Sequence, residues 1–233
     1  MRPLPEASPC QTRMEVEFAR ARVTLNACGG LFLPDLRVLV VSDLHLEKGS
    51  FFASRGNPMP CHDTRDTLLR LAESIRIYAP RTVICLGDSF HDRLAGARMR
   101  LPDATLLRQL IGGVDEWVWL TGNHDPEIPD GVPGSVAPCL RLGALNLCHK
   151  PEDGTRPLIA GHYHPKHTLR LAGRRHVAAR CFVLGDGLLL MPAFGAYAGG
   201  LRTADAAIAG LFDPAPSGYV LIYRDKLWAI SHN

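Results

Sequence analysis

The sequence lacks several features that would mark it as a polyanion-binding or membrane protein. Lys and Arg number 26 and Asp and Glu number 23, so the formal net charge of the 233-residue chain is only +3. Binding to a polyanion therefore requires local clustering of charge or a bound cation. Aromatic residues make up only 7% of the chain, and no aromatic-rich platform for stacking single-stranded bases is visible. The N-terminal region has no long apolar segment, so we expect neither a signal peptide nor a membrane span.

The cysteines also lack a recognisable framework. There are seven, at positions 10, 28, 61, 85, 139, 148 and 181, and no two have the Cys-x-x-Cys spacing of a zinc ribbon. Cys85 and Cys148 lie in apolar runs, where a free thiol acts as a small hydrophobe. An odd number without regular spacing therefore indicates a reducing cytoplasm.

Length and composition fit one globular domain. A chain of this length, with 46% hydrophobic and 21% charged residues, can bury one sizeable core. Residues 1–13 contain three prolines and little periodicity, so we expect a loose leader there. No repeat or linker divides residues 14–233, which are expected to form a single domain.

Hydrophobic periodicity predicts a mixture of strands and helices. Residues 15–25 roughly alternate and are typical of one strand, whereas residues 63–78 have helical spacing, with Asp63 or Thr64 able to cap the start. Further helices are expected at 103–111 and 203–211, and a hairpin at 219–223 and 226–231. Because helices separate the early apolar runs, we expect parallel strand–helix–strand units. The predicted fold is a mixed α/β sandwich of two packed sheets with helices outside.

Five apolar runs end in residues that can bind metal ions. In chain order the run ends are Ser42-Asp43-Leu44-His45, Gly87-Asp88, Gly122-Asn123-His124-Asp125, His149 and Gly161-His162-Tyr163-His164. In open α/β sheets, ligands bind where the strands end, and Asp, Asn and His all bind first-row metals. The glycines suit places where backbone turns tightly or approaches another group closely. A single Asp or His beside a strand is usually a satisfied polar group, but the five together predict a metal site.

These motifs resemble the calcineurin-like metallophosphoesterases. More narrowly, residues 42–50, 85–93 and 191–200 are similar to the DNA ligase-associated metallophosphoesterases. The resemblance extends over nearly the whole chain and implies a four-layer αββα fold of two mixed sheets. It also implies phosphodiester hydrolysis with two divalent metal ions, in the bacterial DNA-damage response.

The resemblance assigns roles within the motifs. Two cations about 3.5–4 Å apart need an anionic bridge, which we expect to be Asp88. Asp43, His45 and His164 would complete one ion's ligands, and Asn123, His149 and His162 the other's. Mixed Asp, Asn and His ligands suit manganese, iron or zinc, and the resemblance favours manganese. His124 would face the scissile phosphate, with Asp125 holding its other imidazole nitrogen.

Residues outside the metal motifs are candidates for substrate contact. His91 could approach the substrate or brace its loop, and Asp92 could pair with Arg93. A basic stretch at Lys166, Arg170, Arg174, Arg175 and Arg180 could bind a polynucleotide backbone or be a solvated face. Arg93, Arg98 and Arg100 could form a second edge. His62, His167, His176 and His232 fit no motif and are expected to be solvated or structural.

Three hypotheses follow. The first is a metal-dependent phosphodiesterase that cuts single-stranded DNA internally during repair, with DNA as partner, a functional link to a DNA ligase, helicase or exonuclease, and a homodimer as one possible state. The second is a small-molecule phosphatase or cyclic-nucleotide phosphodiesterase with the same site. The third is a binding scaffold that kept the fold without catalysis, which the filled metal motifs argue against.

Overall fold

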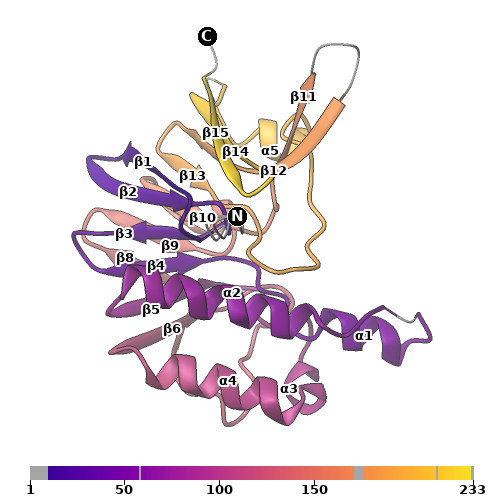
Figure 1. Ribbon diagram of the computed structural model, residues 1–233. Coiled ribbons are helices and arrows are strands. Elements are labelled where there is room, and N and C mark those ends of the chain that lie inside the picture. Colours follow the sequence, from indigo (N-terminus) through magenta and orange to yellow (C-terminus); the bar gives the residue numbers. More distant parts are fainter. Residues whose placement is uncertain (1–9, 58, 171–175, 214, 232–233) are drawn as a thin grey trace, which may run out of the picture.

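The computed structural model describes residues 10–57, 59–170, 176–213 and 215–231 (Figure 1). Residues 1–9 of the predicted leader lie outside this part. Cys10 is buried and bonded to Cys28, and Arg13 already belongs to the first strand. The predicted boundary between residues 13 and 14 therefore falls within the first strand. Among the described residues, no helix is long and apolar enough to cross a membrane.

Seven strands form the first sheet, in their order along the chain. They are β1 (Arg13–Phe18), β2 (Ala21–Asn26), β3 (Leu31–Leu33), β4 (Val38–Val41), β5 (Thr82–Leu86), β6 (Glu116–Leu120) and β7 (Ser135–Ala137). Neighbours are antiparallel from β1 to β4 and parallel from β4 to β7. The β4–β5 crossover contains α1 (Lys48–Ser54) and α2 (Asp63–Tyr78), and the β5–β6 crossover contains α3 (Ala95–Arg98) and α4 (Leu101–Gly112). Parallel pairing through helical crossovers is thus confirmed.

Eight strands form the second sheet, in the order β15-β14-β12-β13-β10-β9-β8, with β11 paired to β12. Their bounds are β8 (Cys139–Leu142), β9 (Leu145–Cys148), β10 (Leu158–Ala160), β11 (Lys166–Arg170), β12 (His176–Gly185), β13 (Leu188–Leu190), β14 (Gly218–Tyr223) and β15 (Lys226–Ser231). Strand β10 is parallel to both of its neighbours, β9 and β13. All other pairs in this sheet are antiparallel. Both sheets are therefore mixed, as predicted.

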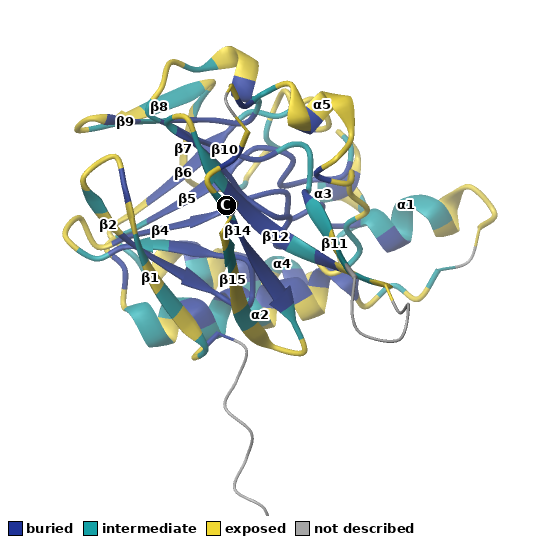
Figure 2. Cartoon of the chain, turned by 90° about the horizontal axis from the view of Figure 1, so that it is seen from above, coloured by how far each residue is buried: buried dark blue, intermediate teal, exposed yellow. Residues whose placement is uncertain are grey.

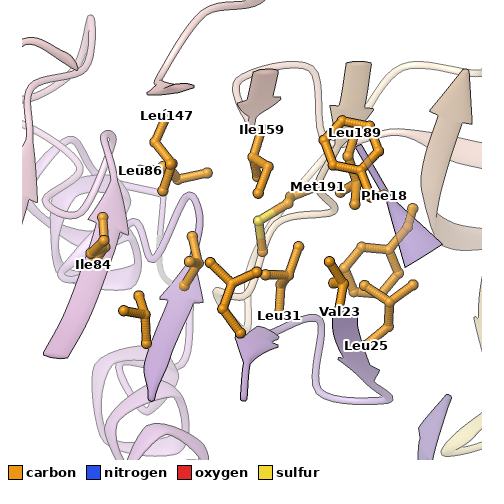
Figure 3. Packing of buried hydrophobic residues seen from close by; sticks show 14 of the residues in the cluster. Phe18, Val23, Leu25, Leu31, Ile84, Leu86, Leu147, Ile159, Leu189 and Met191 are labelled. Atoms are coloured by element: carbon orange, nitrogen blue, oxygen red, sulfur yellow. The ribbon is translucent and has the colours of Figure 1, made fainter. Parts of the chain in front are cut away.

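The main core lies between the two sheets (Figure 3). Ile84, Leu86 and Leu31 of the first sheet point toward Leu147 and Ile159 of the second, and all five are buried. A second core joins the first sheet to α2 and α4, and a third covers the outer face of the second sheet through α5 (Ala206–Ala209). Central strands such as β4 and β5 are accordingly buried, whereas edge strands such as β1 and β15 are partly exposed (Figure 2). The predicted four layers are present, with the fourth reduced to one short helix and its loops.

Several local predictions need correction. Residues 15–25 form not one strand but the hairpin β1–β2, which turns at Ala19 and Arg20 with φ of 51° and 66°. The helix expected at 203–211 is shorter than predicted and consists only of α5. The predicted helix 63–78 is confirmed as α2, yet neither predicted cap acts there: Asp63 Oδ2 accepts from the Gly49 N–H (3.0 Å) and Thr64 Oγ1 from the Glu47 N–H (2.8 Å). These side chains fix the loop after β4 instead.

The prediction of a free thiol was wrong for Cys148, and the linear spacing indicated neither of the two disulfides. Cys139 and Cys148 are register partners on β8 and β9 with Cα atoms 4.5 Å apart, and they form a disulfide. A second disulfide joins Cys10 to Cys28 across 18 positions. A pair facing across antiparallel strands leaves no Cys-x-x-Cys signature, so linear spacing could not reveal it. Cys61, Cys85 and Cys181 are free thiols.

Candidate metal centre

The five ligand-bearing strand ends meet at one edge of the sandwich. β4, β5 and β6 are parallel neighbours in the first sheet, and β9 and β10 are parallel neighbours in the second. Their carboxyl ends carry all seven predicted metal ligands, Asp43, His45, Asp88, Asn123, His149, His162 and His164. Three of these residues form one group of potential ligands and three others form a second group. Within each group, the ligand atoms lie within 4.8 Å of one another. Residues up to 121 positions apart in sequence thus converge on one site.

The first group contains Asp43, His45 and His164. His164 Nε2 lies 3.1 Å from Asp43 Oδ1 and 3.3 Å from His45 Nε2. Asp43 is fully buried, and its Oδ1 has only ring nitrogens of His164 (3.1 Å) and His149 (3.9 Å) nearby, with no donor of good hydrogen-bond geometry among the described residues. A buried carboxylate oxygen without a donor is costly unless a cation binds it. The group therefore fits a divalent cation.

The second group contains Asp88, His149 and His162, and Asn123 joins it. His149 Nε2 lies 3.1 Å from Asn123 Oδ1, 3.2 Å from His162 Nδ1 and 3.4 Å from Asp88 Oδ2. The other ring nitrogen of His149 bonds the Leu86 carbonyl (2.7 Å) and so orients the ring, as backbone carbonyls commonly do for metal-binding histidines. Two acceptor oxygens and two imidazole nitrogens in this arrangement suit a first-row metal ion.

The backbone at the site is held in an unusual conformation. Asp43, His45, Asp88, His162 and His164 all have positive φ, between 44° and 70°. Non-glycine residues adopt this region rarely, and they persist there when surrounding contacts enforce it. Such contacts exist: the Asp43 N–H donates to the Gly87 carbonyl (3.3 Å), the His45 N–H to the Asp88 carbonyl (2.9 Å) and the His162 N–H to Asp43 Oδ2 (3.1 Å).

Glycines permit this close approach of loops. A Cβ on Gly122 would lie 2.2 Å from Asp88 Oδ1, one on Gly87 2.6 Å from the His149 ring, and one on Gly161 2.6 Å from Asp43 Oδ2. All three distances are too short for real contacts. The sequence left open a tight turn or a close approach as the reason for each glycine, and the close approach is present at all three positions.

Asp125 does not contact the imidazole of His124, so that predicted hydrogen bond was wrong. Its carboxylate accepts four backbone N–H groups, from residues 88 (2.8 Å), 89 (2.6 Å), 90 (3.1 Å) and 122 (3.0 Å). His124 Nδ1 instead bonds the His91 carbonyl (2.9 Å). Asp125 therefore positions the loop that bears Asp88, while a backbone carbonyl orients His124.

His91 and His124 form a pair beside the first group. Their rings stack with centroids 5.0 Å apart, and His91 Nδ1 lies 3.5 Å from Nδ1 of His45. His91 is buried against the ring of Phe51 on α1, whereas His124 is exposed. His91 thus braces a predicted ligand, and His124 is open to a substrate.

Burial and charge tune the titratable groups in opposite directions. Burial lowers the pKa of His45 to about 3 and that of His91 to about 4, so both are neutral, the form that binds metals. Burial also opposes the charged form of His149, but Asp88 and Asp43 outweigh it and raise the pKa to about 9. Burial raises the pKa of Asp125 to about 7. For Asp43 and Asp88, burial acts upward, yet the neighbouring histidines keep both carboxyl pKa values below the ordinary range.

The other predicted contacts have mixed outcomes. Arg93 is exposed and, together with Phe90, lines a separate cavity of about 380 Å³. Asp92 pairs not with Arg93 but with Arg98, so the predicted partner was wrong. Lys166 lines a small cavity next to His164. Arg170 ends β11 and its side chain is outside the described part, as are residues 174 and 175.

The remaining histidines lie away from the two ligand groups. His62 precedes α2 without making a side-chain cap, and His176 is exposed. His167 Nδ1 bonds Thr203 Oγ1 (2.7 Å) and its ring stacks on Tyr219. His232 is outside the described residues.

Two basic residues near the site had no signal in the metal motifs. Lys48 begins α1, and its pKa is lowered, chiefly by burial, while the charges of Asp63 and then Asp88 act in the opposite direction. Arg70, on α2, lines the same cavity as Lys166. Lys48 lies within the stretch 42–50 that carries the family resemblance, so that stretch could have indicated it. Nothing in the spacing of α2 distinguishes Arg70 from any other helix arginine.

The family model of the calcineurin-like phosphoesterases matches residues 36–179, which include every strand end described above. The chain belongs to this family. It is therefore a metal-dependent phosphoesterase, and its fold is the metallophosphoesterase fold. The family uses divalent metal ions, and the two ligand groups are candidate sites for them.

The solved structure of a nuclease agrees with this membership. The nuclease MPE of Pseudomonas putida is 30% identical with a TM-score of 0.73, covering 94% of this chain and 100% of that one. The E. coli phosphoesterase YfcE is 14% identical with a TM-score of 0.40, covering 84% of this chain and 99% of that one. No match was found among curated proteins.

Proposed function

We propose that this phosphoesterase is a manganese-dependent nuclease that cuts single-stranded DNA internally. The observation that carries the proposal is the likeness to the Pseudomonas putida nuclease over the full length of that protein, together with a complete set of ligands at the strand ends. Phosphodiester hydrolysis by two metals needs little covalent participation of the protein, so positioned ligands are the main requirement.

When bound, two divalent cations would supply an activated water and neutralise the developing charge on the phosphate. The protein's own groups hold and orient the reactants. Asp88 lies at the second ligand group, and its charge also acts on His45 of the first, which suits the proposed bridging role. His124 is exposed and has Nδ1 engaged by the His91 carbonyl. Its Nε2 is therefore the atom that can donate a hydrogen bond or a proton to the phosphate oxygens.

The openness of the site supports a strand as substrate rather than a small enclosed molecule. Asn123 and His124 are exposed, and His162 and His164 are half-buried. Small-molecule sites usually bury most of their ligand. The resemblance to ligase-associated enzymes supports the rest of the proposal: a role in DNA repair in the cytoplasm, with a ligase, helicase or exonuclease as functional partner.

The test is cleavage of a circular single-stranded DNA in the presence of manganese, beside a generic aryl phosphodiester and with Asp88→Asn as control. We expect the wild type to linearise the circle and to hydrolyse the ester, and the variant to do neither. A circle has no end, so its cleavage requires an endonuclease. Hydrolysis of the ester alone would retain the metal chemistry and overturn the DNA assignment, leaving small nucleotides as the next substrates to test. Replacing manganese by zinc or iron in the same assay tests the choice of metal.

A further inference from the structure

A small cavity next to the metal centre is lined by three cationic side chains. It measures about 150 Å³ and its walls include His164, one of the predicted metal ligands. Arg70 from α2, Lys166 from β11 and Arg180 from β12 supply the charge. The rest of the lining is Ala or Gly from residues 193–199, so small side chains leave the cationic groups accessible.

These three charges are not neutralised locally. Lys166 and Arg180 are register partners on β11 and β12, and like charges directly opposite on neighbouring strands destabilise a sheet. Among the described residues, none of the three forms an ion pair within 4.0 Å. Asp66 and Asp225 act on Arg70, and Asp225 on Arg180, only through longer-range attraction.

The two guanidinium groups are held in place by backbone carbonyls. Arg180 donates to the carbonyls of Ala193 and Ala27 (both 3.1 Å), and Arg70 donates to that of Phe194 (2.8 Å). Burial, followed by the charge of Arg70, lowers the pKa of Arg180 to about 10. The cavity thus presents pre-positioned, partly desolvated positive charge that an anion would stabilise.

We propose that this cavity binds a backbone phosphate of the DNA strand that flanks the phosphate being cut. This inference rests on the proposed nuclease function. The volume of the cavity is below the ~300–1,000 Å³ typical of sites for drug-sized ligands. The cavity therefore suits one phosphate group rather than a nucleoside. His164 forms a wall of the cavity and belongs to the first ligand group, so the two phosphates would be close neighbours on one strand.

The first test compares selectivity in two matched variants. Lys166→Gln removes one charge from the cavity. Arg20→Gln removes one charge at the β1–β2 turn. The strand directions place this turn at the edge of the first sheet opposite the metal ligands. We measure kcat/KM for a single-stranded oligodeoxynucleotide and for an aryl phosphodiester, which has no flanking phosphate. Lys166→Gln should lower the ratio of the two values about tenfold, the scale expected for one charge-assisted contact. Arg20→Gln should retain the wild-type ratio.

The second test locates the phosphate. Oligodeoxynucleotides that contain one neutral methylphosphonate linkage, moved stepwise along the strand, are assayed with wild type and with Lys166→Gln. We expect one position beside the cut to raise KM in the wild type and to have little effect in the variant. The slope of log KM against the logarithm of the salt concentration should also be smaller in the variant by about 0.7, the value for one single-strand phosphate contact.

The possible failures are distinguishable. An unchanged selectivity ratio in Lys166→Gln, or a methylphosphonate profile identical to that of the wild type, would overturn the subsite while the nuclease function stands. Hydrolysis of the aryl ester without any cleavage of DNA by the wild type would overturn the nuclease function and the subsite with it.

Discussion

The two sheets contribute different halves of the metal centre. The first sheet supplies Asp43, His45, Asp88 and Asn123, and with them both carboxylates; the second supplies only histidines, at 149, 162 and 164. The carboxylates are almost fully buried, whereas His162 and His164 are half-buried. The first half thus provides the negative charge, and the second provides imidazole ligands, two of which lie closer to solvent.

This difference indicates separate requirements for the two halves. Burying a carboxylate is costly without donors or cations. Backbone N–H groups supply part of this need, since Asp88 Oδ1 accepts from His124 (2.9 Å) and Asp43 Oδ2 from His162 (3.1 Å). The second-sheet histidines reach these carboxylates only because the two sheets pack face to face (Figures 1 and 3). Substitutions in the first half should therefore affect charge and chemistry, and those in the second mainly metal affinity.

The largest expected effect separates the halves directly. Asp88→Asn should lower kcat on any phosphodiester by about a thousandfold or more, and added manganese should not restore it, because the proposed anionic bridge between the two cations would be lost. His162→Asn keeps a neutral ligand, so saturating manganese should restore much of its activity. Manganese titrations of kcat check both variants. Equal rescue of the two would contradict the proposed division between charge and geometry.

A smaller loss is expected from crowding the first half without changing its charge. A Cβ at Gly122 would lie 2.2 Å from Asp88 Oδ1, whereas one at Gly112 would meet nothing within 4 Å. We expect Gly122→Ala to lower kcat/KM about a hundredfold through displacement of Asp88 by a fraction of an ångström, and Gly112→Ala to leave it unchanged. A Gly122→Ala enzyme with wild-type kinetics would show that the position of Asp88 is not critical.

A loss of about ten- to hundredfold in manganese affinity is expected for Asp125→Asn, the range for groups that orient metal ligands. The amide nitrogen of the new side chain would face backbone N–H groups that now donate hydrogen bonds to the carboxylate, and it cannot accept them. The dissociation constant from isothermal titration calorimetry measures this effect. If the variant instead lost activity on the aryl ester while its manganese affinity stayed at the wild-type value, Asp125 would not act by orienting the metal ligands. The predicted contact between Asp125 and His124 would then need to be reconsidered.

Sequence reasoning succeeded where a residue's role follows from its place on a strand. Each predicted ligand comes directly after an apolar run, and parallel strands bring such positions to one edge. It failed where the partner depends on packing between distant segments. The donors to Asp125 come from residues 88–90, and Cys148 meets Cys139 only through strand register. α1 and α3 were missed because helices this short are not stable by themselves and leave little periodicity.

The smallest expected effect concerns pH and again contrasts the halves. The pKa of His149, from the second sheet, is raised to about 9, whereas that of His45, from the first, is lowered to about 3. A raised histidine pKa stabilises the folded state below the unfolded pKa, ~6.5, and that contribution is lost as pH rises through the folded pKa. The metal-free protein in EDTA should therefore have a lower Tm at pH 9 than at pH 7.

His149→Asn removes the titrating group, so its Tm should change less over the same interval. Manganese should also reduce the dependence, because a bound cation requires neutral His149 at both pH values. An equally steep fall in Tm for the variant and the wild type would show that another group, and not the second-sheet histidine, carries the proton. Since Asp88 is the nearer of the carboxylates that hold this proton, at 3.4 Å, Asp88→Asn should weaken the same pH dependence and thereby link the charge of one sheet to the titration of the other.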